Sequence, residues 1–195
     1  MYVKKEADTE RSLCIEKVLE DIPGGGTIDP DDFKSDTETM LEGALVADDA
    51  NSLYHVVKTA KLYEDEADNE TAYKVLKDHE FVVGDYLMNA AGTSAAYAIT
   101  DVDTETSEDY DVLTVGTTLG VAMSTGDLLV QAAGEATAGN GAYLYTPDGI
   151  AMNSVDLTKD NLGCGIMVRG TVKESLLPYY VDSNIKAYLP LVRFV

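Results

Sequence analysis

Residues 163–179 (GCGIMVRGTVKESLLPY) contain the stretch that decides the fold, because they hold the clearest strand pattern in the chain. Ile166, Val168 and Val172 fall on one side of an extended backbone, and Met167 falls on the other. A period of two is typical of a half-buried strand, since successive side chains point to opposite faces. We therefore predict a strand whose core positions are Ile166, Val168 and Val172, with the preceding segments laid against it.

Two further features of this stretch shape the strand and end it. Gly170 lies among the inward positions, where the missing side chain allows a bulge or the close approach of another backbone. Residues 173–177 can form one helical turn, and Pro178 stops it because proline disfavours helical geometry in the residue before it.

The C-terminal end, residues 180–195, predicts a short helical turn followed by a strand. Asp182 or Ser183 can cap the turn, and Pro190 ends it. The last five residues, LVRFV, are apolar enough to be tied into a sheet or an interface. Residues 161–195 carry four basic and two acidic side chains, and they are the only sizeable net-basic segment of the chain.

This basic segment predicts self-association. The whole chain has a net charge of -21, so on a second copy the segment would face acidic surface, which favours binding between copies. We expect a homo-oligomer. The predicted interface residues are Arg169, Lys173, Leu191, Arg193 and Phe194.

Composition limits the possible partners. The chain has 195 residues, 45% of them hydrophobic, which is enough to bury a real core. With 14 basic against 35 acidic residues it repels phosphates, so we expect neither nucleic acid nor an anionic membrane surface as a partner. No apolar stretch is long enough for a membrane span, and no apolar signal region is found at the N-terminus, so we expect no membrane insertion and no secretion signal.

Residues 1–50 differ in sequence pattern from the rest of the chain. They predict an arm or an irregular subdomain. Residues 11–21 fit a short helix and a strand about equally well, and both interpretations stay open. Residues 23–26 (PGGG) indicate a flexible break, and residues 29–32 (DPDD) indicate a turn or a capped helical turn.

Residues 51–195 predict a β-domain. Short apolar runs are separated by turns such as Gly84-Asp85 and Gly126-Asp127, and residues 54–62 and 71–76 indicate a hairpin with a long acidic loop. Such intervals are typical of a sandwich or a barrel, and the helical crossovers that parallel βαβ units need are missing. The predicted fold class is therefore mainly β: a compact barrel or sandwich with an irregular N-terminal arm and short helical turns.

The search for catalytic and metal-binding residues is mostly negative. His55 and His79 with a carboxylate can form a metal site, but no short ligand spacing supports one, and surface or hairpin-flanking histidines are the expected outcome. Residues 101–109 are acidic like a calcium loop, yet they lack its glycine and its final glutamate. We expect no enzyme, no metal and no cofactor, with a small metal-dependent enzyme built on the two histidines as an alternative.

The two cysteines add little to this search. Cys14 and Cys164 show no paired spacing, so two free thiols are expected, and a disulfide between arm and strand stays open.

Three stretches of the chain resemble the head fibre and head decoration proteins of tailed bacteriophages, especially those found as prophages in gut bacteria. They are residues 54–87, residues 113–132 and residues 163–195. In order, they contain a lysine-flanked strand pair, a VGD turn, an LG turn before a second GD turn, the sequence RGTV followed by LLPY, and a final strand with LP and RF. The resemblance covers roughly residues 51–195.

The resemblance implies a non-enzymatic virion protein that is β-rich and often trimeric. Such a protein is made in the host cytoplasm and lies on the outside of the icosahedral shell, where it binds the major capsid protein and either clamps capsomers or carries fibres. The expected oligomer is therefore a trimer. The competing hypothesis is a secreted or surface binding module of a gut bacterium, directed at carbohydrate or protein.

Overall fold

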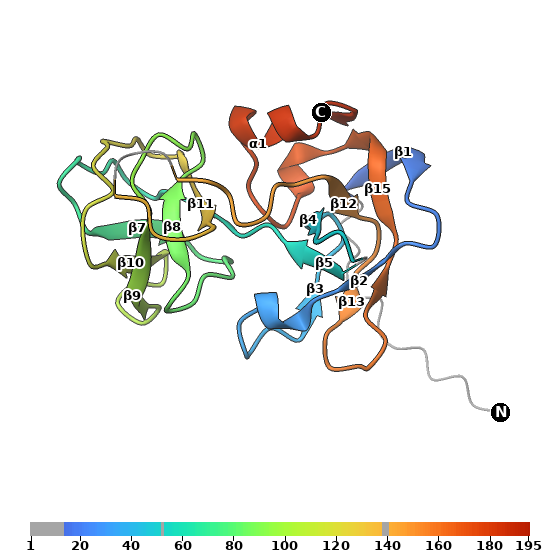
Figure 1. Ribbon diagram of the computed structural model, residues 1–195, viewed down its shortest axis with the longest axis horizontal. Coiled ribbons are helices and arrows are strands. Elements are labelled where there is room, and N and C mark those ends of the chain that lie inside the picture. The colour runs from blue at the N-terminus through green and yellow to red at the C-terminus, as the bar shows by residue number, and fades with distance from the viewer. Residues whose placement is uncertain (1–13, 52, 138–140) are drawn as a thin grey trace.

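The protein is mainly β, as the sequence predicted, in a computed structural model that describes residues 14–51, 53–137 and 141–195. Figure 1 shows two lobes, each built around a curled sheet. The strands of the first sheet are β1 (Ile15–Asp21), β2 (Gly26–Ile28), β4 (Leu45–Asp48), β5 (Leu53–Val56), β12 (Gly149–Ala151), β14 (Gly163–Cys164), β15 (Ile166–Val172) and β16 (Val192–Phe194). The strands of the second are β6 (Thr59–Lys61), β7 (Ala72–Leu76), β8 (Tyr86–Asn89), β9 (Tyr97–Asp103), β10 (Tyr110–Val115) and β11 (Leu128–Ala132).

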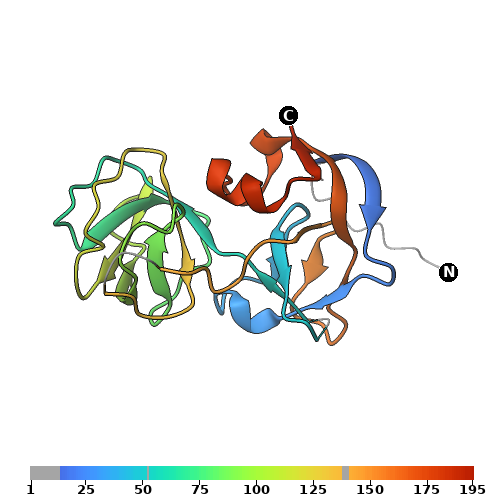
Figure 2. The ribbon, with the colours of Figure 1, turned by 45° about the horizontal axis from the view of Figure 1, so that its top comes forward.

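One lobe is inserted into the other. The first sheet has the order β1-β15-β12-β4-β5-β2-β14, with β16 also beside β15, so it combines both ends of the chain. The second sheet, β6-β11-β8-β9-β10-β7, comes from the middle alone. We call residues 14–58 and 145–195 the base lobe and residues 59–144 the inserted lobe (Figure 2).

The division predicted at residue 50 falls inside the base sheet. Strands β4 and β5, on either side of it, pair antiparallel with Val46 opposite Val56. Strand β1 pairs with β15, so residues 15–21 form a strand rather than a helix. The physical reason is that β4 and β15 both need neighbours on their two edges, and strands on both sides of residue 50 supply them. Residues 1–13 of the predicted arm lie outside the described residues.

The predicted hairpin of residues 54–62 and 71–76 is divided between the lobes. Its first strand splits at Val57-Lys58 into β5 of the base lobe and β6 of the inserted lobe. Only an isolated bridge between Leu62 and Val75 joins the two predicted arms directly. The hydrophobic alternation of residues 54–62 is interrupted by Lys58, and this is the point where the chain passes from one sheet to the other.

Strand β15 is buried on both faces near its start. Ile166 and Met167 are both fully buried, and they belong to two different core clusters on opposite sides of the sheet. Val172 is fully buried as well, whereas Val168 is only half-buried. The assignment of Met167 to the outer face is therefore wrong: a side chain on that face of the sheet is covered by the apolar cluster that also lines the junction between the lobes.

Gly170 lies where β1 crosses β15 closely, with shifts of register on either side of the pair Val18–Gly170. A Cβ atom at Gly170 would lie 2.3 Å from the Lys17 carbonyl oxygen and 2.3 Å from the Met167 sulfur. Both distances are far inside van der Waals contact, so one of the two strands would have to move.

Gly170→Ala is expected to lower the free energy of unfolding by about 1–3 kcal/mol, as overpacking of a tight contact does. The matched control is Gly134→Ala, because nothing lies within 4 Å of a Cβ atom placed there, and its effect should stay within roughly 0.5 kcal/mol. Urea unfolding of both variants gives the comparison. Equal stabilities would mean that the close approach of β1 is wrong.

The short helical turns follow local capping chemistry. In η1 (Pro30–Asp32) the Asp29 side chain accepts a hydrogen bond from the Asp31 amide, and in α1 (Ser183–Tyr188) Asp182 accepts one from the Ile185 amide. The turn η2 (Glu174–Leu176) precedes Pro178 as predicted. A small two-stranded sheet of β3 (Thr39–Met40) and β13 (Val155–Asp156) completes the base lobe. No helix in the described part of the chain has the length and apolarity to cross a membrane.

Candidate functional site

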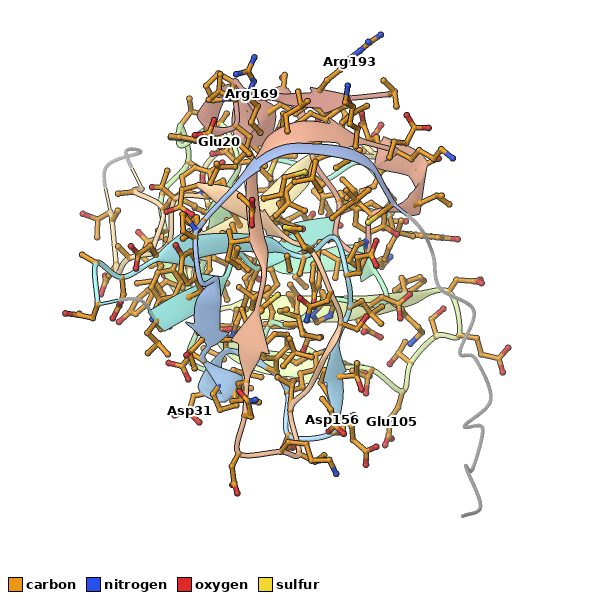
Figure 3. All side chains as sticks on the ribbon, turned by 90° about the vertical axis from the view of Figure 1, so that its right-hand side faces the viewer. Glu20, Asp31, Glu105, Asp156, Arg169 and Arg193 are labelled. Carbon is orange, nitrogen blue, oxygen red and sulfur yellow. The ribbon has the colours of Figure 1, made fainter. Side chains whose placement is uncertain are left out.

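The predicted interface residues come together on one surface of the base lobe, built by β1, β15 and β16. Strand β16 runs parallel to β15, with Thr171 opposite Arg193, and β1 lies along the other edge of β15 with Glu20 opposite Arg169. Arg169 and Arg193 project at the same end of the molecule (Figure 3). We call the exposed side chains of this region the C-terminal surface: Val18, Leu19, Arg169, Lys173, Leu191, Arg193 and Val195, together with the exposed charged residues Glu16, Lys17, Glu20 and Asp21 of β1.

The cations of the C-terminal surface are only partly neutralised. Lys173 lies 3.4 Å from Glu16, measured from Nζ to Oε1. Arg169 and Arg193 make no ion pair with any residue that the structure describes. These two arginines stand out in a chain with a net charge of -21, because unpaired surface cations attract acidic groups.

Large apolar side chains lie among these cations. Leu19 is 54% exposed, Leu191 58% and Val195 49%. Exposed apolar groups beside arginine are typical of protein–protein interfaces, where arginine is enriched and exposed apolar patches mark binding sites. Phe194 differs from the other predicted interface residues, because it is half-buried and packs against the core of the base lobe, with the Lys186 amine 5.4 Å from its ring centre.

Strand β1 is the part of this surface that the sequence analysis missed. Its sequence, IEKVLED, does not alternate clearly, and in the structure only Ile15 is half-buried while the other six residues are exposed. Strand β1 is an edge strand, so its outer backbone groups have no neighbouring strand within the described sheet. A strand that is exposed on both faces is the signal that points to an interface, and it is visible only once the strand is placed.

The two histidines do not form a common site. The Nδ1 atom of His55 lies 3.0 Å from Asp32 Oδ2, and the ring stacks on Tyr145 with 4.0 Å between ring centres. Burial raises the pKa of Asp32, while the bond to His55 acts in the opposite direction. The Asp32 carboxylate holds η1 against β5, because it also accepts a hydrogen bond from the Val56 amide.

His79 is engaged with a different carboxylate in the inserted lobe. Its Nδ1 accepts the Phe81 amide at 3.2 Å, and its Nε2 lies 3.2 Å from Asp111 Oδ2. Burial, with the nearby charge of Lys34, lowers the pKa of His79 to about 4, although Asp111 acts in the opposite direction. Within the described ranges no three His, Cys, Asp or Glu side chains converge as metal ligands.

The low pKa of His79 makes stability depend on pH. An unfolded histidine binds its proton near pH 6.5, so between pH 6.5 and 4 the unfolded state holds more protons than the folded state, and stability falls as pH falls. We expect the titration of His79 alone to lower the free energy of unfolding by roughly 2 kcal/mol between pH 7 and pH 5.

Urea unfolding of His79→Asn at pH 7, 6 and 5 checks this expectation. Asparagine can still accept the Phe81 amide, yet it does not titrate, so the variant should lose that part of the pH dependence. If the variant and the wild type keep parallel pH profiles, His79 is not neutral in the fold.

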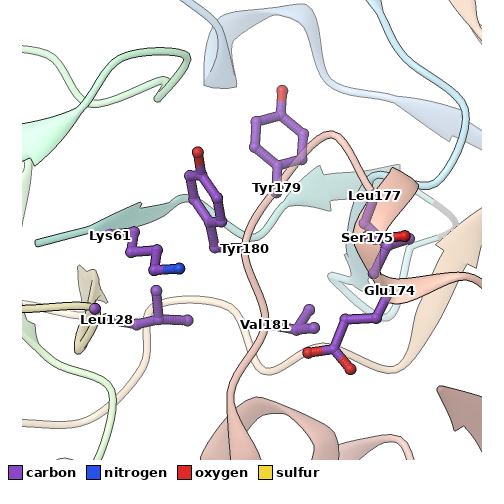
Figure 4. A pocket seen from close by; sticks show the side chains of 9 residues that line it. Lys61, Leu128, Glu174, Ser175, Leu177, Tyr179, Tyr180 and Val181 are labelled. Atoms are coloured by element: carbon purple, nitrogen blue, oxygen red, sulfur yellow. The ribbon is translucent and has the colours of Figure 1, made fainter. Parts of the chain in front are cut away.

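A cleft of about 280 Å³ lies between the lobes (Figure 4). Lys61 and Leu128 approach it from the inserted lobe, and Glu174 and Tyr180 from the base lobe. The Lys61 amine lies 5.3 Å from the centre of the Tyr180 ring. The Glu174 carboxylate is already bound by Lys186 at 2.6 Å, so the cleft does not present a free acid–base pair.

Buried polar contacts hold the two lobes together near this cleft. Lys58 is 4% exposed and its Nζ lies 2.9 Å from Asp85 Oδ2. Glu80 of the inserted lobe accepts the Lys34 amide and the Thr37 hydroxyl, both at 3.0 Å, from the base lobe. An apolar cluster with members in both lobes continues across the same junction. The lobes therefore share a core as well as hydrogen bonds.

The remaining candidates are structural. Cys14 and Cys164 are both buried and unpaired, and burial together with Glu42 raises the pKa of Cys14 to about 11, so its thiolate is scarce at neutral pH. In the acidic loop, Asp103 accepts the amides of Glu105 and Thr106, which closes the turn on itself. In comparisons with known proteins, no protein-family model, curated protein or solved structure matches this chain.

Proposed function

We propose that this protein is a non-enzymatic structural protein of a tailed-bacteriophage head, which binds the outside of the capsid as a homo-oligomer of three copies. Its partners are copies of itself and the major capsid protein, and its location is the outer surface of the virion. The proposal is supported by the resemblance of residues 54–87, 113–132 and 163–195 to head fibre and decoration proteins.

The observation that carries the proposal is the C-terminal surface. Arg169 and Arg193 are unpaired within the described residues and lie beside the exposed Leu191 in a chain that is otherwise strongly acidic. A protein that works by contact between copies needs such a surface, whereas a monomeric protein gains nothing from exposing it. The acidic remainder keeps a highly repeated surface protein soluble and away from packaged DNA.

The arrangement of the two lobes is compatible with decoration. The C-terminal surface belongs to the base lobe, and the inserted lobe extends beside it as a separate β-structure (Figure 2). Because the lobes share an apolar core, a load on one lobe is transmitted to the other without bending at a flexible linker.

Two measurements test the proposal. Sedimentation at tens of micromolar is expected to give a trimer, and a monomer would exclude self-association. Immunogold electron microscopy of phage particles induced from the strain that encodes the protein is expected to label the outside of the heads. Purified particles without label, from a strain in which the protein is produced, would exclude a place on the virion.

One observation favours the second candidate, a carbohydrate-binding module of a bacterial surface. Tyr63 is 39% exposed and its ring lies 5.0 Å from that of Tyr110, with the Lys74 amine 5.4 Å from the Tyr110 ring centre. The two rings are inclined at 37° to each other, and an aromatic ring with an apolar face and a polar end suits a sugar ring. Binding to a glycan array that is lost in Tyr63→Ala would support this candidate, and an array without signal would exclude it.

A further inference from the structure

The C-terminal surface has a counterpart at the opposite end of the base lobe. Figure 3 places Asp31 and Asp156 at the end of the molecule away from Arg169 and Arg193. Strand β13 joins Asp156 to the residues beside β3, because the Leu157 amide donates to the Glu38 carbonyl. We call the exposed carboxylates of η1, β13 and the adjoining loops the acidic surface: Asp31, Asp36, Glu38, Asp156 and Asp160.

The acidic surface keeps an excess of negative charge. Lys159 lies 3.7 Å from Asp156, from Nζ to Oδ2, and both side chains are largely exposed. The other carboxylates of this surface form no ion pair with any residue in the described ranges.

We infer that the C-terminal surface of one copy binds the acidic surface of the next copy, in a head-to-tail contact. The inference rests on the proposed self-association and names the acidic surface as the part of the next copy that the C-terminal surface binds. Both halves of the contact are on one chain, so every copy offers one of each. Such a heterologous contact gives a closed ring where the rotation from one copy to the next permits it, and an open chain of copies where it does not. A ring of three needs a rotation of about 120° between copies, so the two surfaces must meet obliquely rather than straight end to end.

Charge favours the head-to-tail contact over a two-fold one. In a two-fold contact the C-terminal surface meets a copy of itself, in which Arg169 and Arg193 already lie beside Glu20 and the other carboxylates of β1. In the head-to-tail arrangement Arg169 and Arg193 meet the acidic surface, where only Asp156 has a cation within ion-pair distance among the described residues.

The salt dependence of association distinguishes this charged contact from an apolar one. Copies with a net charge of -21 repel each other over long distances, and about 0.1 M salt screens that repulsion beyond roughly 10 Å. Close arginine–carboxylate pairs weaken at higher salt, where the screening length is about 3 Å at 1 M. Association should therefore strengthen from low salt to about 0.15 M and weaken again toward 1 M. A continuous increase up to 1 M would overturn the charged contact.

Charge exchange gives the decisive test by sedimentation velocity. Arg169→Glu/Arg193→Glu and, separately, Asp31→Lys/Glu38→Lys should each weaken self-association at least tenfold, because each places like charges across the contact. Mixing the two variants should restore association, since each altered surface now complements the altered surface of the other variant. In the mixture the two variants must alternate, so only even-numbered assemblies can close.

The control is Glu108→Lys/Asp109→Lys on the inserted lobe, which changes the net charge by the same amount as Asp31→Lys/Glu38→Lys and should assemble like the wild type. Variants that assemble normally alone, a mixture that stays monomeric, or a wild type that is monomeric would each overturn the head-to-tail contact. The virion assignment is judged separately by immunogold labelling. If the heads are labelled but the mixed variants do not associate, the proposed function stands and the head-to-tail contact falls. If the mixed variants associate but the heads are not labelled, the head-to-tail contact stands and the virion assignment falls.

Discussion

Met167→Asp is expected to prevent folding, because it places a carboxylate in the apolar cluster shared by both lobes. Met167 is fully buried and its strand neighbour on β12 is Ile150, which is also fully buried. An unpaired charge in such a place costs several kcal/mol, and the whole domain is stabilised by only about 5–15 kcal/mol. The expected result is insoluble protein or a loss of the cooperative unfolding transition.

The neighbouring position supplies the matched control. Val168 is half-buried, so Val168→Asp keeps its charge in contact with water and should cost only about 1 kcal/mol. If Met167→Asp gives no soluble protein, Met167→Ala measures the same site more gently, with an expected loss of about 2–5 kcal/mol in urea unfolding. The hydrophobic alternation of the strand predicts the opposite order of the two positions. Val168→Asp as the more damaging change would restore that order and contradict the two-sided core.

Lys58→Met is expected to lower the free energy of unfolding by about 3–5 kcal/mol, because it leaves the Asp85 carboxylate, which is only 12% exposed, without its cation. Asp85 also accepts the Val82 amide at 3.1 Å and the Gln131 side-chain amide at 2.8 Å. These bonds remain in the variant, yet they do not neutralise the charge. The double variant Lys58→Met/Asp85→Asn removes both charges and should recover part of the loss.

A second ion pair, which is closer but more exposed, shows whether burial or the N–O distance determines the cost. Lys186 lies 2.6 Å from Glu174, but about a third of its side chain is exposed, so Lys186→Met should cost less than about 1 kcal/mol. Urea unfolding of the three variants gives the comparison. Losses of similar size for Lys58→Met and Lys186→Met would mean that the pair between Lys58 and Asp85 is not desolvated at the lobe junction.

The elements that depend on near neighbours in the chain were predictable. Turns at Gly84 and Gly126 need the positive φ that glycine allows, and the structure has φ of 100° and 93° there. The helical turn capped by Asp182 depends on one side chain and an amide three residues later. Such features follow from sequence because all the interacting atoms lie within a few residues.

The predicted strand of residues 163–172 shows where local reasoning ends. Its extended form was predictable, and Ile166 and Val172 are indeed buried. Alternation assumes one covered face, but near β12 the sheet is covered on both, so Met167 is buried next to Ile166. The second layer comes from segments far away in sequence, and no pattern within the strand reports it.

The sequence by itself determined that the chain is mainly β, where its turns and caps lie, and that residues 161–195 are net basic, because these depend on composition and on neighbours along the chain. Only the tertiary structure decided that residues 59–144 form an inserted lobe and that β1 lies beside the arginines. It also decided that the acidic surface lies at the opposite end of the base lobe (Figure 3). These depend on strand pairing between distant segments, whose energy is shared by both partners and cannot be read from either one alone.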